Sequence, residues 1–137
     1  MARVMICDDD CAMAETLAAA LVASGHDAET CRHTMDMLRA AADGQFDLIA
    51  FGLDMAGFGR AGALEALSEI APRTALIALH DRPSDIIRPA AHARLAAILS
   101  RPVAVNDFIY AVERALGNRR VTPSLEASSS ERSRQTF

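Results

Sequence analysis

The chain has 137 residues, of which 51% are hydrophobic, and its formal net charge is −4. This length fits one domain with a real core, and the negative charge argues against a nucleic-acid surface, because binding to phosphates needs a basic stripe. No apolar stretch is long enough to span a membrane and the N-terminus lacks a signal-peptide pattern, so we expect a cytoplasmic protein with no membrane or nucleic-acid partner.

Strand and helix patterns alternate along the chain. In chain order we expect a strand at 3–7, a helix at 11–24, an edge strand at 26–31, a helix at 34–43, a central strand at 46–53, a helix at 61–70, a strand at 74–80, a strand at 97–100 and a helix at 104–116. Gly25, Gly44 and Gly117 are the expected helix stops. Between the last two strands Pro89 removes a helical hydrogen bond, so a helix there should be short, kinked or begin at Pro89.

This alternation predicts an α/β fold. Right-handed crossovers between five strands imply a flavodoxin-like (βα)5 doubly wound parallel sheet with strand order 2-1-3-4-5. Residues 118–137 have almost no apolar side chains to offset the entropy cost of ordering, so we expect a domain over 1–117 and a flexible tail over 118–137. In such a sheet, ligands bind outside the carboxyl ends of the first and third strands.

Acidic residues stand at the first of these two ends. Asp8, Asp9 and Asp10 follow the first strand, and three crowded carboxylates repel one another unless a cation or a guanidinium lies among them. Helix capping is an adequate explanation for Asp10 alone. For Asp8 and Asp9 we favour a cation or arginine site.

The second end reads Gly52-Leu53-Asp54-Met55-Ala56-Gly57 after an apolar run. The order of these motifs resembles a bacterial response-regulator receiver domain, in which one strand ends in an acidic pair and another in a phosphate-accepting Asp. The resemblance covers about residues 3–117. It implies magnesium at the acidic pair, a hydroxyl residue after the fourth strand, and a Lys before a cis-Pro after the fifth.

Several of the family's positions are altered in this chain. By position, the acidic pair corresponds to Asp8 and Asp9, the acceptor to Gly52, the hydroxyl residue to His80, and the Lys-Pro pair to Arg101 and Pro102. Without a carboxylate at Gly52, magnesium loses a ligand, so we expect no required cofactor and at most weak magnesium binding at Asp8 and Asp9.

Three of the pocket residues allow alternatives. Arg101 could pair bidentately with Asp8 or Asp9 and keep the pocket permanently occupied, or it could be an ordinary solvent-facing arginine. Asp54 could act as a displaced acceptor, although we favour a loop acid. His80 could respond to pH, although a packed neutral histidine is the commoner case.

The three cysteines, with His26 or His33, suggest no metal site or catalytic group. An odd number of cysteines in a cytoplasmic protein favours buried apolar side chains, and a disulfide is the less favoured alternative. The cysteines and histidines have no recognised zinc spacing, and no nucleophile can be paired with a base. We therefore do not expect an enzyme.

The resemblance and its departures predict a stand-alone, degenerate receiver domain, a pseudo-receiver in two-component or phosphorelay regulation that signals by protein contact. It implies a kinase, regulator, output protein or second copy bound at the face of the fourth helix, fifth strand and fifth helix. The residues expected on this face are Ile86, Ile87, Pro89, Ile98, Val105 and Ile109. One alternative is a conventional receiver that uses Asp54, with His80 or Arg101 on the phosphate; the other is a flavodoxin-like domain that binds a small ligand or metal.

Overall fold

The computed structural model describes residues 1–53, 63–81 and 94–121. Within them, five parallel strands form one sheet in the order β2-β1-β3-β4-β5, which confirms the predicted fold class. The elements are β1 Arg3–Cys7, α1 Cys11–Ala23, β2 Asp27–Cys31, α2 Thr34–Ala42, β3 Leu48–Gly52, α3 Ala63–Ile70, β4 Ala75–His80, β5 Ala97–Ser100 and α5 Val105–Val121.

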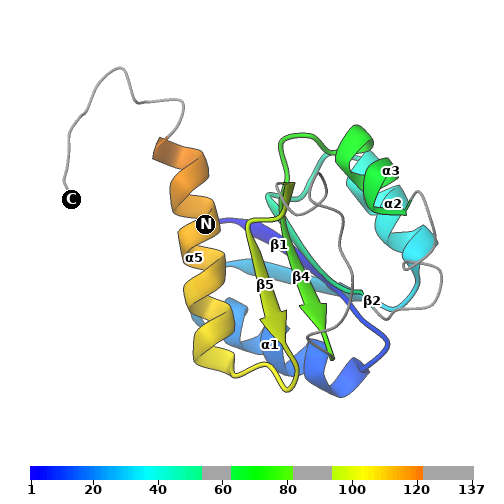
Figure 1. The fold of residues 1–137 in the computed structure, drawn as a ribbon. Helices are drawn as coiled ribbons and strands as arrows, with labels where there is room; N and C mark the ends of the chain where they lie inside the picture. Colours follow the sequence, from blue (N-terminus) through cyan, green and yellow to red (C-terminus); the bar gives the residue numbers. More distant parts are fainter. Residues whose placement is uncertain (54–62, 82–93, 122–137) are drawn as a thin grey trace.

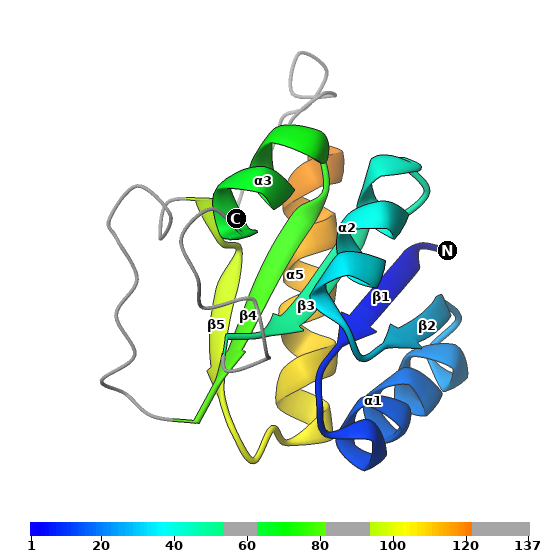
Figure 2. The same ribbon diagram turned by 90° about the vertical axis from the view of Figure 1, so that its right-hand side faces the viewer.

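Helices cover both faces of the sheet. Figure 1 shows α1 and α5 on one side and α2 and α3 on the other, and Figure 2 shows the same layers after a quarter turn. The side chains of a strand alternate between these faces, so Val4 and Ile6 pack under α1 and α5, while Met5 and Cys7 pack under α2 and α3. Every residue of β3 is buried, as expected for a central strand.

Two of the three expected glycine stops are confirmed. Gly25 and Gly44 take the left-handed conformation, with φ of 97° and 71°, two residues after the last residues of α1 and α2. The stop predicted at Gly117 is wrong, because α5 continues through it to Val121. Phe108, Val112 and Leu116 pack α5 onto the sheet, and this packing outweighs the modest helix penalty of one glycine.

The expectation that no disulfide forms is also wrong. Cys7 and Cys31 are register partners at the last rung between β1 and β2, and they are joined by a disulfide. Their Cα atoms lie 4.6 Å apart, within the range that a disulfide can bridge. Counting cysteines could not show this, because strand pairing brings the two residues together. Cys11 is a free, partly exposed thiol.

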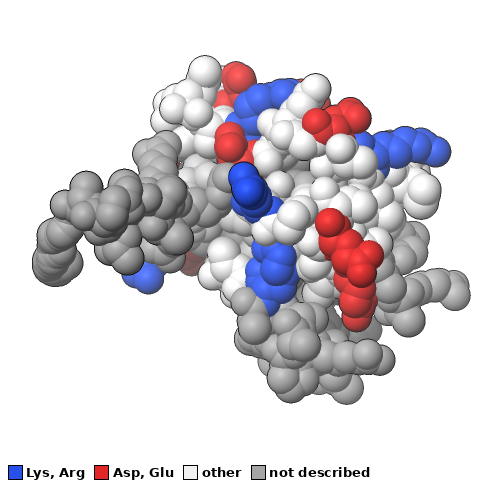
Figure 3. Space-filling model, turned by 90° about the horizontal axis from the view of Figure 1, so that it is seen from above, with Lys and Arg blue, Asp and Glu red and all other residues white. Residues whose placement is uncertain are grey.

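The end of the sheet away from the carboxyl ends of β4 and β5 carries mixed charges. Figure 3 views this end, and acidic and basic side chains are interspersed over its described surface. Arg3 at the start of β1 illustrates the mixture, since its guanidinium pairs with Glu29 at 2.7 Å and lies over the ring of Phe46. Among the helices of the described ranges, none has the length and hydropathy needed to cross a bilayer.

Candidate functional site

The candidate site lies where β1, β3 and β5 end. Asp8 follows β1 and is buried, with 3% of its surface exposed, whereas Asp9 and Asp10 are exposed. Arg101 follows β5, and the Arg101-Pro102 peptide bond is cis, as the resemblance implied. The carboxyl ends of parallel strands share one edge of a sheet, and this brings two residues 93 positions apart into contact.

Arg101 forms the internal ion pair that the sequence left open. Its Nη2 donates to Oδ2 of Asp8, and its Nη1 donates to Oδ1 of Asp81 at 3.1 Å. The Arg101 side chain is 14% exposed and that of Asp8 only 3%, so the first pair is largely shielded from water. The solvent-facing alternative for Arg101 is therefore wrong.

The second partner, Asp81, was missed from the sequence. Asp81 directly follows His80 at the end of β4. An acid just after a strand end was the sequence signal that could have identified it as a pocket residue. Its carboxylate is half exposed, so it contributes less to the burial of the guanidinium than Asp8 does.

Gly52 provides the space for the guanidinium. A Cβ atom at residue 52 would lie 2.5 Å from Nη2 of Arg101 and 2.7 Å from Oδ2 of Asp8. Both atoms are ends of side chains, and moving either one would disturb the pair between Arg101 and Asp8. The guanidinium of Arg101 therefore lies where a side chain at residue 52 would begin. It fits there because residue 52 is glycine.

The site keeps Arg101 charged. Burial alone lowers the pKa of the Arg101 guanidinium, but its hydrogen bonds and the charges of Asp8 and Asp81 outweigh burial and raise that pKa above its ordinary value. Because folding raises this pKa, the stability that the pair contributes is fully present at any pH below the pKa of arginine in the unfolded chain. It is lost only at higher pH. At neutral pH the guanidinium is therefore a permanent cation.

The backbone holds Asp8 in place from two directions. Its Oδ1 accepts a hydrogen bond from the Asp10 N–H at 3.0 Å, and its own N–H donates to the Cys31 carbonyl at 3.0 Å. The Asp10 side chain caps α1 by accepting from the Met13 N–H, which confirms the capping interpretation of Asp10. Asp8, rather than the exposed Asp9, is thus the acid fixed in the pocket.

The other predicted pocket residues are placed differently. His80 lies opposite Ser100 across β4 and β5, with its Nε2 at 3.2 Å from the Ser100 hydroxyl oxygen. Pro102 is exposed. Asp54 lies outside the described residues.

The pocket does not fit a magnesium ion. One oxygen of Asp8 is taken by Arg101 and the other by the Asp10 N–H, and Gly52 offers no side-chain oxygen. Over 1–53, 63–81 and 94–121, no group of three His, Cys, Asp or Glu side chains could hold a metal. A divalent ion here would also meet the fixed positive charge of Arg101.

Known proteins share this fold. No protein-family model matches the chain. The chain is 28% identical to the DNA-binding transcriptional regulator NtrC of Azospirillum brasilense over 135 residues. The aligned region covers 98% of this chain and 28% of the length of NtrC. A response regulator receiver domain protein from Clostridium thermocellum superposes with a TM-score of 0.77 at 20% identity, covering 89% of this chain and 99% of that one.

NtrX from Brucella abortus superposes similarly, with a TM-score of 0.79 at 19% identity, covering 91% of this chain and 29% of NtrX. The fold is therefore that of response-regulator receiver domains. The chain spans less than a third of the length of NtrC or NtrX.

Proposed function

We propose that this chain is a receiver-like signalling module of two-component regulation that does not accept phosphate and acts by protein contact. The observation that carries the proposal is the Arg101 guanidinium, which lies over Gly52 and pairs with Asp8. In the family that the sequence resembles, phosphorylation places a group at this strand end. Here a side chain of the protein already occupies the position.

Charge favours the same conclusion. The Lys of the family also places a cation at this position, and in this chain that cation, Arg101, pairs with Asp8 and offsets the repulsion between adjacent carboxylates. Arg101 supplies a built-in positive charge to Asp8, and the raised pKa of Arg101 means that this charge stays at neutral pH. The pocket is thus held in one state, and enzymatic activity of its own is not part of the proposal.

The first test is phosphorylation. Incubation of the full chain with a small phosphoryl donor and magnesium should give no added phosphoryl group in the intact mass, because residue 52 has no carboxylate to attack with. Gly52→Asp combined with Arg101→Lys, which restores the family's residue types at both positions, is the matched comparison. A stoichiometric mass increase in the unaltered chain, lost in Asp54→Asn, would overturn the proposal and favour the conventional receiver.

Magnesium affinity is the second test. We expect binding that is roughly millimolar or weaker, since the remaining oxygen ligands make a poor cage and Arg101 repels the ion. Calorimetry of the full chain and of Arg101→Ala checks this, and the substitution should strengthen binding by freeing the Asp8 carboxylate. Micromolar affinity in the unaltered chain would contradict the expectation.

We propose that the signal leaves through the face that includes β5 and α5, to a kinase, regulator, output protein or second copy; the fourth helix expected on this face falls outside the described residues. Ile98 on β5 and Val105 and Ile109 on α5 are only partly buried and pack at the margins of the two cores. Tyr110 adds an aromatic side chain that is 64% exposed on α5. Ile86, Ile87 and Pro89 lie outside the described residues.

A further inference from the structure

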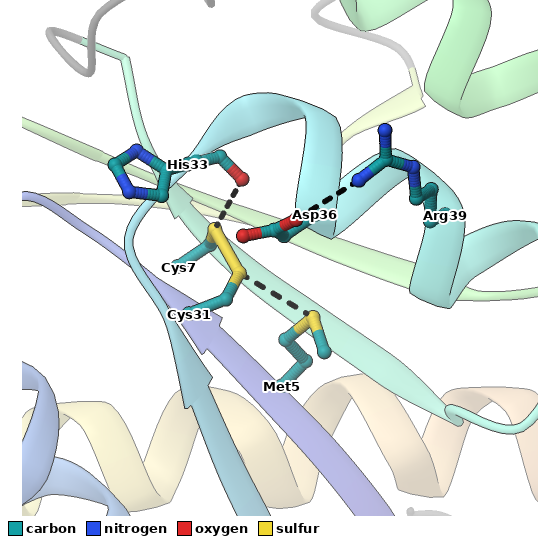
Figure 4. The surroundings of a disulfide bond; sticks show 6 residues. All are labelled: Met5, Cys7, Cys31, His33, Asp36 and Arg39. Atoms are coloured by element: carbon teal, nitrogen blue, oxygen red, sulfur yellow. Dashed lines mark hydrogen bonds and ion pairs between the residues drawn. A yellow bond between two sulfur atoms is a disulfide. The ribbon is translucent and has the colours of Figure 1, made fainter.

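The disulfide joins a fully buried cysteine to a partly exposed one. Cys7, at the end of β1, has no exposed surface. Cys31 ends the edge strand β2 and is partly exposed. Figure 4 shows the bond on the side of the sheet that α2 covers. If a small reagent reaches the bond, we expect it to do so from the partly exposed Cys31 side.

Each sulfur also lies near an atom that could accept a hydrogen bond from a thiol. Cys7 Sγ is 3.7 Å from the carbonyl oxygen of His33, and Cys31 Sγ is 3.7 Å from Sδ of Met5 (Figure 4). A disulfide sulfur carries no proton to donate, whereas a thiol is a weak donor. On reduction the two sulfurs must move apart to non-bonded contact, and each thiol would have a potential acceptor nearby.

We propose that Cys7 and Cys31 form a reversible redox site, opened by a low-molecular-weight thiol of the glutathione class. This goes beyond the signalling role and does not depend on it. Disulfides that form in reducing compartments are usually transient or redox-sensing, which fits a site with two accommodated states.

The chemistry is thiol–disulfide exchange. A glutathione thiolate attacks Cys31 Sγ and forms a mixed disulfide there; the bond to Cys7 breaks, and the Cys7 sulfur leaves as a thiolate that takes a proton from water. A second glutathione thiolate attacks the glutathione sulfur of the mixed disulfide. Oxidised glutathione departs, and the Cys31 thiolate is protonated. Two electrons pass from two glutathione molecules to the protein.

The bond lies next to the candidate site. Cys7 directly precedes Asp8, and the Asp8 N–H donates to the carbonyl oxygen of Cys31 at 3.0 Å. Opening the disulfide removes the covalent link across this rung and leaves the hydrogen bonds to hold it. The backbone under the Asp8 carboxylate should then open more often, although the fold stays the same.

The experiment equilibrates the full chain in buffers of increasing reduced-to-oxidised glutathione ratio, followed by alkylation and peptide mass spectrometry. A Cys11→Ser chain, treated in parallel, removes the third thiol. We expect the Cys7–Cys31 bond to be lost and regained across the series with unchanged far-UV circular dichroism. Amide exchange at Asp8 should rise about tenfold on reduction, and Cys31→Ser should match the reduced protein in oxidising buffer.

Three results would overturn the proposal. Both thiols could stay free in oxidising buffer while the protein is folded, the bond could persist at every glutathione ratio, or the protein could unfold when the bond is reduced. None of these measurements uses a phosphoryl donor or a protein partner. A failure of the redox proposal can therefore be distinguished from a failure of the proposed signalling role.

Discussion

Replacing Arg101 with methionine should lower the free energy of unfolding by about 3 kcal/mol, because the substitution leaves the buried Asp8 carboxylate without its counter-ion. Methionine keeps much of the apolar stem, so most of the loss reports the missing charge and hydrogen bonds rather than a cavity. Urea denaturation monitored by circular dichroism measures the change.

Two further variants make this result specific. Asp8→Ala combined with Arg101→Met removes both charges and should recover most of the stability, since a buried ion pair can often be replaced by apolar groups at little cost. Arg39→Met breaks the exposed pair with Asp36 and should change almost nothing. If Arg101→Met changed the free energy of unfolding as little as Arg39→Met, the pair of Arg101 and Asp8 would not stabilise the pocket.

Gly52→Ala should destabilise the protein by about 2 kcal/mol, although alanine is normally the better residue in regular structure. Gly52 lies within a regular strand, so the penalty comes from the close contacts of the new Cβ with Arg101 and Asp8. Gly117→Ala is the matched control. Nothing lies within 4 Å of a Cβ at residue 117 in α5, so that substitution should stabilise by about 0.5 to 1 kcal/mol.

A double-mutant cycle locates the cause. In an Arg101→Met background, Gly52→Ala should cost clearly less, because the nearest obstructing atom has been removed. If Gly52→Ala lowered the free energy of unfolding equally in both backgrounds, the destabilisation would not come from the contact with Arg101. The cycle therefore tests whether Gly52 and Arg101 act as one unit.

Local sequence patterns determined most of the fold. Apolar runs of strand length alternate with amphipathic helices. This alternation and the right-handed crossover rule together allow few arrangements other than the observed sheet. The acids after β1 and the glycine at the end of β3 were visible in the same way. Each depends only on residues close together in the chain.

Contacts between distant residues were decided by tertiary structure. The sequence allowed Arg101 to pair with Asp8, pair with Asp9 or face solvent, and only the meeting of strand ends selected Asp8 and added Asp81. Similarly, the register between β1 and β2 put Cys7 opposite Cys31, against the prediction from their number. Side chains far apart in sequence carry no local signal of their separation in space, because that separation is set by how whole strands pair and end.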